Sequence, residues 1–420
     1  MKLIRFYNKT ISVKDLLFVL CAVIPTFNNY ELTFATWTLT LLFTIRKNYN
    51  TYLFKLVLST LIILIIAFFT TSYYDASNFK IIRDITYLLK PTFGLLVGYQ
   101  LFNNDYEKTI RLIIKVGLIL AILHFIILFT GVVVFKIHNI HALRYRGGYF
   151  SDFEVYSFVL LLFYKKFNIN YNSKDRLKHL YIIGISVFFY FARTNFIQLF
   201  IFIITLMGLL KLNYKALKIV STLILISALC YAAIYYYNPR RGAGGIEAFM
   251  YKVKIAPVEP FKTKINQDDW KDFNDNYRSF ENIITVRQVS GTGTAEVLFG
   301  KGLGSEIDLG RKIYTNDDEQ IRFLPALHNS YMTVFLKSGL LGVMLMLYFL
   351  FILFKYSKTH DEQSNINILN RLLMATGLFL IMSNWIFMGL YFKVDNKALI
   401  IGVIIAAKEF LIKKENLINN

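Results

Sequence analysis

Residues 53–71 (LFKLVLSTLIILIIAFFTT) and 109–135 (TIRLIIKVGLILAILHFIILFTGVVVF) are the two clearest apolar segments of the chain. Each is long enough to cross a bilayer, because a helix needs about 20 residues to span about 30 Å of hydrocarbon. A chain surrounded by lipid must also pair its backbone N–H and C=O groups internally, which a helix does. These two segments therefore predict an integral membrane protein.

Similar apolar blocks recur on both sides of these segments, and together they predict an all-α membrane protein with about twelve transmembrane helices. The first two blocks are short, so we expect them to be tilted or joined as a helical hairpin. The composition agrees, because 55% of the residues are hydrophobic, against about 45–50% in soluble domains. The blocks cover roughly residues 14–27, 31–45, 53–71, 81–101, 109–134, 149–164, 178–192, 195–210, 217–237, 329–354, 368–390 and 397–412.

The formal net charge of +20 is carried largely by short turns between apolar blocks. This distribution argues against a nucleic-acid-binding face, for which the basic residues would gather on one soluble surface. Lysine and arginine favour the cytoplasmic side of a membrane. With twelve spans, the basic turns lie on the same side as both termini, so we expect both termini to be cytoplasmic.

One segment on the opposite side is much longer than the others and divides the chain into three regions. Residues 1–237 are expected to hold transmembrane helices one to nine, residues 238–327 a large extracytoplasmic loop, and residues 328–420 the last three helices. The long loop has thirteen basic and thirteen acidic residues. Within it, residues 276–289 (NYRSFENIITVRQV) space apolar side chains as a short amphipathic helix does. We therefore expect a small, mostly helical cap on the outer face.

Two groups of basic residues break the rule that positive charge lies inside. Arg193 lies in 189–196 (FYFARTNF), a tight outer turn, and Arg146 ends the outer loop 136–146 (KIHNIHALRYR). Ionisable residues near the membrane are costly and therefore candidates for function. The alternative for Arg193 is a side chain that reaches the lipid headgroups, and the alternative for the loop is a solvated turn.

His328 closes the long loop and stands directly before an apolar helix, in the sequence His328-Asn329-Ser330-Tyr331. This position is at the outer membrane interface, where a histidine is suited to proton transfer near neutral pH. Asn329 or Ser330 could cap the helix, and a capping role for His328 itself is the alternative interpretation.

The segment 298–305 (LFGKGLGS) is rich in glycine but lacks the spacing of a phosphate-binding P-loop. We interpret it as a tight turn around Gly302 that brings the cap to the membrane and offers backbone N–H groups to an anion. His138 and His141 have no carboxylate or cysteine nearby to complete a ligand set, and the acidic run 268–275 has the character of a solvated surface. We therefore expect neither a metal site nor a cofactor.

Taken in order, these segments resemble the signature of the O-antigen ligase and polymerase superfamily. The run 328–342 (HNSYMTVFLKSGLLG) is similar to its histidine motif, and 298–305 to the turn that precedes it. The turn at Arg193, the segment 146–152 (RGGYFSD) and Arg278 at the start of the loop helix resemble its conserved arginine positions. Glu154 departs from the pattern, because it stands near a position where many relatives carry asparagine.

The resemblance implies a glycosyltransferase of the type C-like membrane fold that needs no metal and takes an undecaprenyl-diphosphate-linked glycan as its donor. It implies that Arg193 and Arg278 bind the diphosphate, with Arg146, Asn329 and Gly302 as further substrate-binding residues. His328 would receive or orient the acceptor hydroxyl. The acceptor would be a glycan or a second lipid-linked unit, and a chain-length regulator is a further expected partner. The expected location is the bacterial inner membrane, with the active site on its outer face.

Several functions remain open at this point. We favour a polymerase that joins lipid-linked repeat units into O-antigen or capsular polysaccharide. A ligase that transfers finished glycan to lipid A-core or to protein has the same motifs. A transporter or flippase is less compatible, because no paired halves appear and only Pro25 and Pro91 interrupt the apolar blocks. A sensor or scaffold with an outer cap is the remaining alternative.

Overall fold

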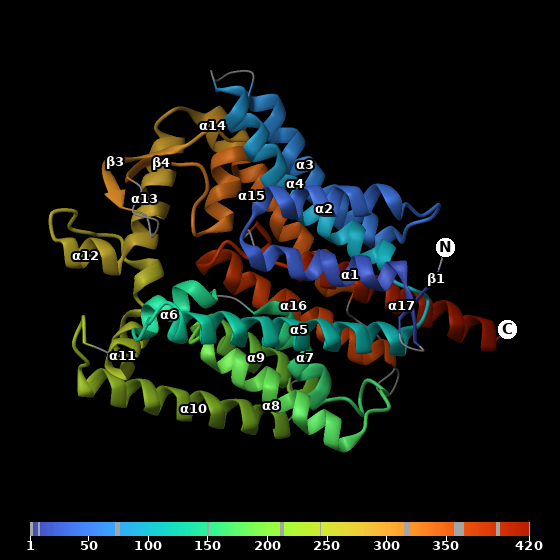
Figure 1. Ribbon diagram of the computed structural model, residues 1–420. Coiled ribbons are helices and arrows are strands. Elements are labelled where there is room, and N and C mark those ends of the chain that lie inside the picture. Colours follow the sequence, from blue (N-terminus) through green and yellow to red (C-terminus); the bar gives the residue numbers. More distant parts are fainter. Residues whose placement is uncertain are drawn as a thin grey trace.

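The computed structural model describes residues 3–6, 9–71, 76–148, 151–210, 214–243, 245–314, 320–356, 365–391 and 395–419, so Tyr149 and Phe150 of the segment 146–152 lie outside the described residues. The protein is mostly helical (Figure 1). The elements up to residue 207 are β1 (Leu3–Phe6), β2 (Lys9–Ser12), α1 (Val13–Val23), η1 (Ile24–Phe27), α2 (Tyr30–Phe43), α3 (Thr51–Thr71), α4 (Asn78–Leu101), α5 (Tyr106–Val133), α6 (Ile140–Gly147), α7 (Asp152–Leu162), α8 (Ser173–Phe189) and α9 (Arg193–Met207). The later elements are α10 (Tyr214–Tyr237), α11 (Gly245–Ile255), η2 (Glu259–Phe261), α12 (Trp270–Asp275), α13 (Tyr277–Ser290), α14 (Thr294–Phe299), β3 (Ile307–Tyr314), β4 (Gln320–Leu324), α15 (Ser330–Tyr356), α16 (Asn365–Ile386), η3 (Gly389–Tyr391) and α17 (Lys397–Asn419).

Each apolar block of the sequence overlaps a helix of the structure. Within the described part of the chain, five helical segments are long and apolar enough to cross a membrane, which agrees with an all-α membrane protein. They are Thr51–Thr71, Tyr106–Val133, Leu217–Tyr237, Ser330–Lys355 and Asn365–Ile386. The expected short pair at the N-terminus is present as α1 and α2, which have 11 and 14 residues. At 1.5 Å per residue these helices are about 17 and 21 Å long, shorter than the hydrocarbon core.

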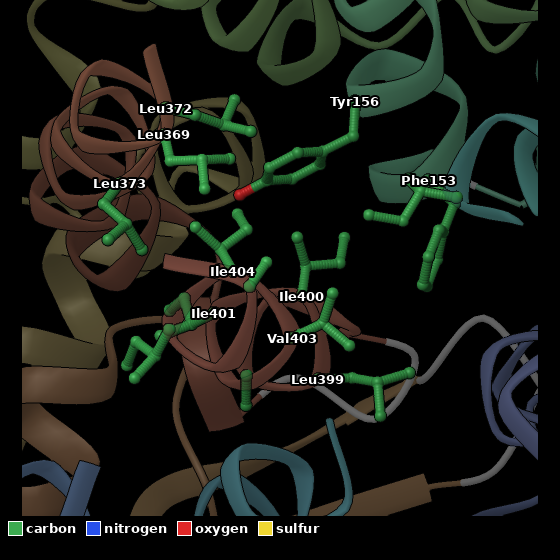
Figure 2. Packing of buried hydrophobic residues seen from close by; sticks show 14 of the residues in the cluster. Phe153, Tyr156, Leu369, Leu372, Leu373, Leu399, Ile400, Ile401, Val403 and Ile404 are labelled. Carbon is green, nitrogen blue, oxygen red and sulfur yellow. The ribbon is translucent and has the colours of Figure 1, made fainter. Parts of the chain in front are cut away.

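The main core lies where α17 packs against α4, α7 and α16, with side chains that are almost entirely buried. Ile400 and Ile404 of α17 lie close to Tyr156 of α7, and the leucines of α16 lie beside them (Figure 2). The Tyr156 hydroxyl is satisfied inside this core by Thr376 Oγ1 at 2.5 Å. Because a buried hydroxyl without a partner is costly, this bond fixes how α7 faces α16.

The segment 238–327 contributes Phe273, Phe280, Ile284 and Leu327 to a second hydrophobic core, which it shares with Phe335 and Leu336 of α15. The amphipathic helix predicted for 276–289 is confirmed as α13. The antiparallel pair of β3 and β4 was not expected. Only Ile307 and Leu309 of β3 show the buried alternation of a strand, which is too short a pattern to recognise in the sequence.

Helix α15 is broken at Gly339, in its N-terminal half. Gly339 has φ 64° and ψ −163°, outside helical geometry, and the segment 298–304 packs into the break. The amide of Lys301 donates to the carbonyl of Leu336 at 2.8 Å, and that of Gly302 to the carbonyl of Lys337 at 3.1 Å. Irregular backbone is tolerated in a membrane protein where other protein groups satisfy it. The glycine-rich loop supplies those groups here.

Charged side chains hold α4 to the same break. The buried Lys337 ammonium pairs with the Asp84 carboxylate, which also accepts from the amide of Gly304 at 2.7 Å. Glu306, just beyond the loop, pairs with Lys80 at 2.6 Å and with Arg83 at 3.1 Å. The loop therefore connects α4 to the N-terminal part of α15, which begins two residues after His328.

Candidate functional site

His328 lies at the junction of the long segment and α15. Its backbone is held on two sides, since its amide donates to Glu281 Oε2 at 3.1 Å and its carbonyl accepts from the amide of Met388 at 2.7 Å. Its Nδ1 lies 3.0 Å from both carboxylate oxygens of Glu281. The His328 side chain is 45% exposed, whereas that of Glu281 is 1% exposed. The imidazole is thus accessible and rests on a buried carboxylate.

Helix α13 presents Glu281 and Arg278 together. The two residues are three positions apart, and residues at this spacing lie on one face of a helix. Phe280 and Ile284 are buried and attach the helix to the second hydrophobic core. Helix α13 therefore presents the Glu281 carboxylate to His328 and the Arg278 guanidinium on the same face.

Arg278 belongs to a cluster of cationic side chains that gathers four separate elements. Its Nη1 donates to Glu259 Oε1 at 2.8 Å. Arg193, at the start of α9, donates from Nη1 to the backbone carbonyl of Lys252 in α11 at 2.5 Å. Arg144 of α6 acts electrostatically on both Lys252 and Arg193. Arg278, Arg193 and Lys252 thus interact with the carboxylate of Glu259, and Arg144 acts on the last two of these cations.

The positive charge of this cluster affects the pKa of Lys252. Burial lowers the pKa of the Lys252 ammonium, and the nearby cations Arg144, Arg193 and Arg278 lower this pKa further, while Glu259 opposes them. Positive groups held close together without full compensation attract an anion. The start of α9 adds the partial positive charge of a helix N-terminus. The arrangement is suited to a ligand with more than one negative charge.

Of the predicted substrate-binding residues, Arg146 takes a different place from the one expected. Its guanidinium lies over the ring of Phe135, 3.6 Å from the centroid. Arg144, two positions earlier, acts on the cluster instead. Residues two apart on a helix point to different sides, so only one of these arginines faces the cluster.

Gly302 has structural contacts that the sequence did not reveal, whereas the helix cap that the sequence allowed for Asn329 is present. The amide of Gly302 donates to Lys337, and a Cβ at Gly302 would lie 2.6 Å from the amide nitrogen of Thr71. The tight turn is present, but this N–H is already used within the protein, so we assign Gly302 a structural role. Asn329 caps α15, because its Oδ1 accepts from the amide of Tyr331 at 2.9 Å.

Sequence reasoning missed Glu281, Glu259, Lys252 and Arg144. For Glu281 a signal was present, namely its helical spacing from Arg278 in an amphipathic segment. Arg144 lies in the basic segment 136–146, which breaks the charge rule, so a signal was present for it as well. For Lys252 and Glu259 there was none, because the packing of distant elements brings them to the cluster. Among the described residues, no group of three or more His, Cys, Asp and Glu side chains is placed to hold a metal ion.

Comparison with known proteins adds no relative: no family model matches the sequence, and no curated protein matches it. The resemblance to the O-antigen ligase and polymerase superfamily therefore rests on the ordered motifs of the sequence itself.

Proposed function

We propose that this protein is a membrane glycan polymerase that joins undecaprenyl-diphosphate-linked repeat units by inverting glycosyl transfer. The observation that carries the proposal is that α13 holds both Arg278, which belongs to the cluster with Arg144, Arg193 and Lys252, and Glu281, which contacts His328. A cationic cluster that shares a helix with the partner of an accessible imidazole is suited to transfer from a diphosphate donor to a hydroxyl acceptor.

The cationic side chains serve the leaving group. Negative charge develops on the diphosphate as its bond to the anomeric carbon breaks, and fixed positive groups stabilise that charge. Arginine is suited to this task because its planar guanidinium binds phosphate through two parallel hydrogen bonds. Arg193 and Arg278 take this role in the proposal, and Lys252 and Arg144 add charge around them.

His328 serves the acceptor. A hydroxyl oxygen of the acceptor attacks the anomeric carbon, its proton passes to the imidazole, and undecaprenyl diphosphate leaves with the electron pair of the broken C–O bond. General-base catalysis of this kind contributes about 10²–10⁴-fold. The 45% exposure of the His328 side chain leaves room for the acceptor to approach.

The proposal includes a topology. Twelve spans, both termini in the cytoplasm and segment 238–327 outside follow from the placement of lysine and arginine in the short loops. The site then lies on the outer face of the bacterial inner membrane, where the lipid-linked donor is presented. A chain-length regulator is the partner that a polymerase of this kind would take.

Purified protein in liposomes with a lipid-linked oligosaccharide tests the function. We expect release of undecaprenyl diphosphate together with a ladder of longer glycans. Transfer of the glycan only to an added lipid A-core acceptor would identify a ligase. Movement of the intact donor across the bilayer without bond cleavage would identify a transporter.

The same assay tests His328. We expect His328→Ala to lose about 10²–10⁴-fold in rate, and His328→Gln to be nearly as defective, since an amide does not accept a proton under these conditions. A rate for His328→Ala within about threefold of wild type would remove the base from the mechanism. Restoration of most of the rate by Gln would make His328 a residue that orients the acceptor.

A further inference from the structure

The contact between Glu281 and His328 involves both the ring and the backbone of the histidine. Glu281 Oε1 and Oε2 each lie 3.0 Å from Nδ1, and Oε2 also accepts from the His328 amide at 3.1 Å. A residue held only as a helix cap would not need a second contact at the ring. The carboxylate fixes the position of the histidine and the rotation of its imidazole together.

Glu281 is itself held firmly. Its side chain is 1% exposed, and Tyr277, one turn earlier on α13, acts on it electrostatically. The Tyr277 ring also meets the His328 ring edge-on, with the centroids 5.9 Å apart. A buried carboxylate is retained where it is hydrogen-bonded, and the amide and the ring of His328 supply the bonds.

The contact determines which ring nitrogen is free. A carboxylate accepts hydrogen bonds, so the nitrogen that faces it carries the proton. That nitrogen is Nδ1, and Nε2 has no hydrogen-bond partner among the described residues. A neutral imidazole with its proton on Nδ1 has its acceptor lone pair on Nε2.

We propose that Glu281 is a positioning residue that holds His328 in the Nδ1–H tautomer, so that Nε2 is the atom that receives the acceptor proton. This inference rests on the proposed function. In the transfer step, the O–H bond of the acceptor breaks, its oxygen bonds to the anomeric carbon, and the proton forms a bond to Nε2. The resulting imidazolium donates from Nδ1 to Glu281, which stabilises its charge.

The tautomer can be measured without substrate. We propose ¹⁵N NMR of histidine-labelled protein in nanodiscs, because protonated and unprotonated ring nitrogens have well-separated resonances. The chain has six histidines, and the signals of His328 are those lost in His328→Gln. We expect wild-type His328 to be protonated on Nδ1.

Glu281→Gln tests the cause. If the Gln oxygen accepts the His328 amide, as Oε2 does, its NH₂ group faces Nδ1 and favours the Nε2–H tautomer. We expect the tautomer to change and the transfer rate to fall about 10- to 100-fold, as for other residues that orient a functional histidine. Glu281→Asp keeps the carboxylate and should preserve the wild-type tautomer and a greater share of the rate. Glu306→Gln, a matched change at a carboxylate that pairs with Lys80 and Arg83, should leave the His328 signals unchanged.

A wild-type ring protonated on Nε2, or an unchanged tautomer in Glu281→Gln, overturns the positioning role whatever the activity. A changed tautomer with the full transfer rate also overturns it. The spectra require no donor, so the tautomer result stands even if the protein proves not to be a transferase. Failure of the proposed function is read separately, from donor turnover by the wild-type protein.

Discussion

At the scale of single residues, substitution of Arg193 is the sharpest test of the cationic cluster. Arg193 donates to the Lys252 carbonyl through one Nη, which leaves its other donors for a ligand. We expect Arg193→Ala to lower the transfer rate about 10²–10³-fold and Arg193→Lys to suffer most of that loss, because an ammonium cannot make the forked contact. Initial rates at normal protein level measure this. Arg287→Lys, on the exposed side of α13, is the matched control, and wild-type rates in Arg193→Ala would remove Arg193 from the site.

Lys252 predicts how donor binding depends on pH. Burial and the neighbouring arginines lower the pKa of Lys252 from its ordinary value of 10.5. Lys252 therefore loses its charge at a lower pH than a lysine with the ordinary pKa. We expect the KM for the donor to rise as the pH increases through the alkaline range. Lys252→Arg stays charged and should move this rise to higher pH. Lys254→Arg, two positions later on α11, should leave the pH at which the KM rises unchanged. Identical pH profiles of the KM in wild type and Lys252→Arg would contradict this role of Lys252.

The site residues that the sequence could predict are those that stand beside a local pattern. Arg193 breaks the charge rule in a tight turn, and His328 precedes an apolar helix. Lys252 and Glu259 lie in segments without such a pattern, and their role depends on how α11 and η2 meet α9 and α13. Long-range packing of this kind leaves no trace in local spacing.

At the scale of elements, the loop that enters the break in α15 can be tested through its glycines. Gly302 has φ +76°, and a Cβ there would lie 2.6 Å from the Thr71 amide nitrogen. Gly242 has a similar φ of +78°, with nothing within 4 Å of the added Cβ. Both alanine variants carry the left-handed strain of about 1–2 kcal/mol. We expect Gly302→Ala to lose about 1–3 kcal/mol more through overpacking.

Thermal unfolding in detergent measures this difference. The midpoint of Gly302→Ala should fall clearly below that of Gly242→Ala. Equal midpoints for the two variants would show that the loop does not pack into α15 as described.

The break of α15 at Gly339 could not be predicted from the apolar pattern of the sequence. The sequence of 329–354 predicts one continuous helix, and the run Lys337-Ser338-Gly339 is the main interruption of its apolar character. Hydropathy reports whether a segment is apolar but not where its backbone bonds go. The partners of the freed carbonyls lie more than 30 positions earlier, at Lys301 and Gly302.

For the whole molecule, the orientation in the membrane is the prediction to test. We expect Trp270→Cys, at a side chain that is 72% exposed, to react with an impermeant thiol reagent from outside. Lys413→Cys, near the C-terminus and 71% exposed, should react only after the membrane is permeabilised. The background lacks Cys21 and Cys230. The opposite pattern of labelling would reverse the topology.

The broken helix also has a mechanical meaning. The part of α15 before Gly339 is held by the glycine loop, by Asp84 and by the segment 238–327, whereas the part after Gly339 exposes Met344, Leu347 and Phe351. A helix that is continuous transmits a change of tilt along its whole length, but a jointed one does not. When bilayer thickness changes and membrane helices tilt in response, we expect His328 to stay in place relative to the segment 238–327. The joint would then keep the geometry of the imidazole independent of the surrounding lipid.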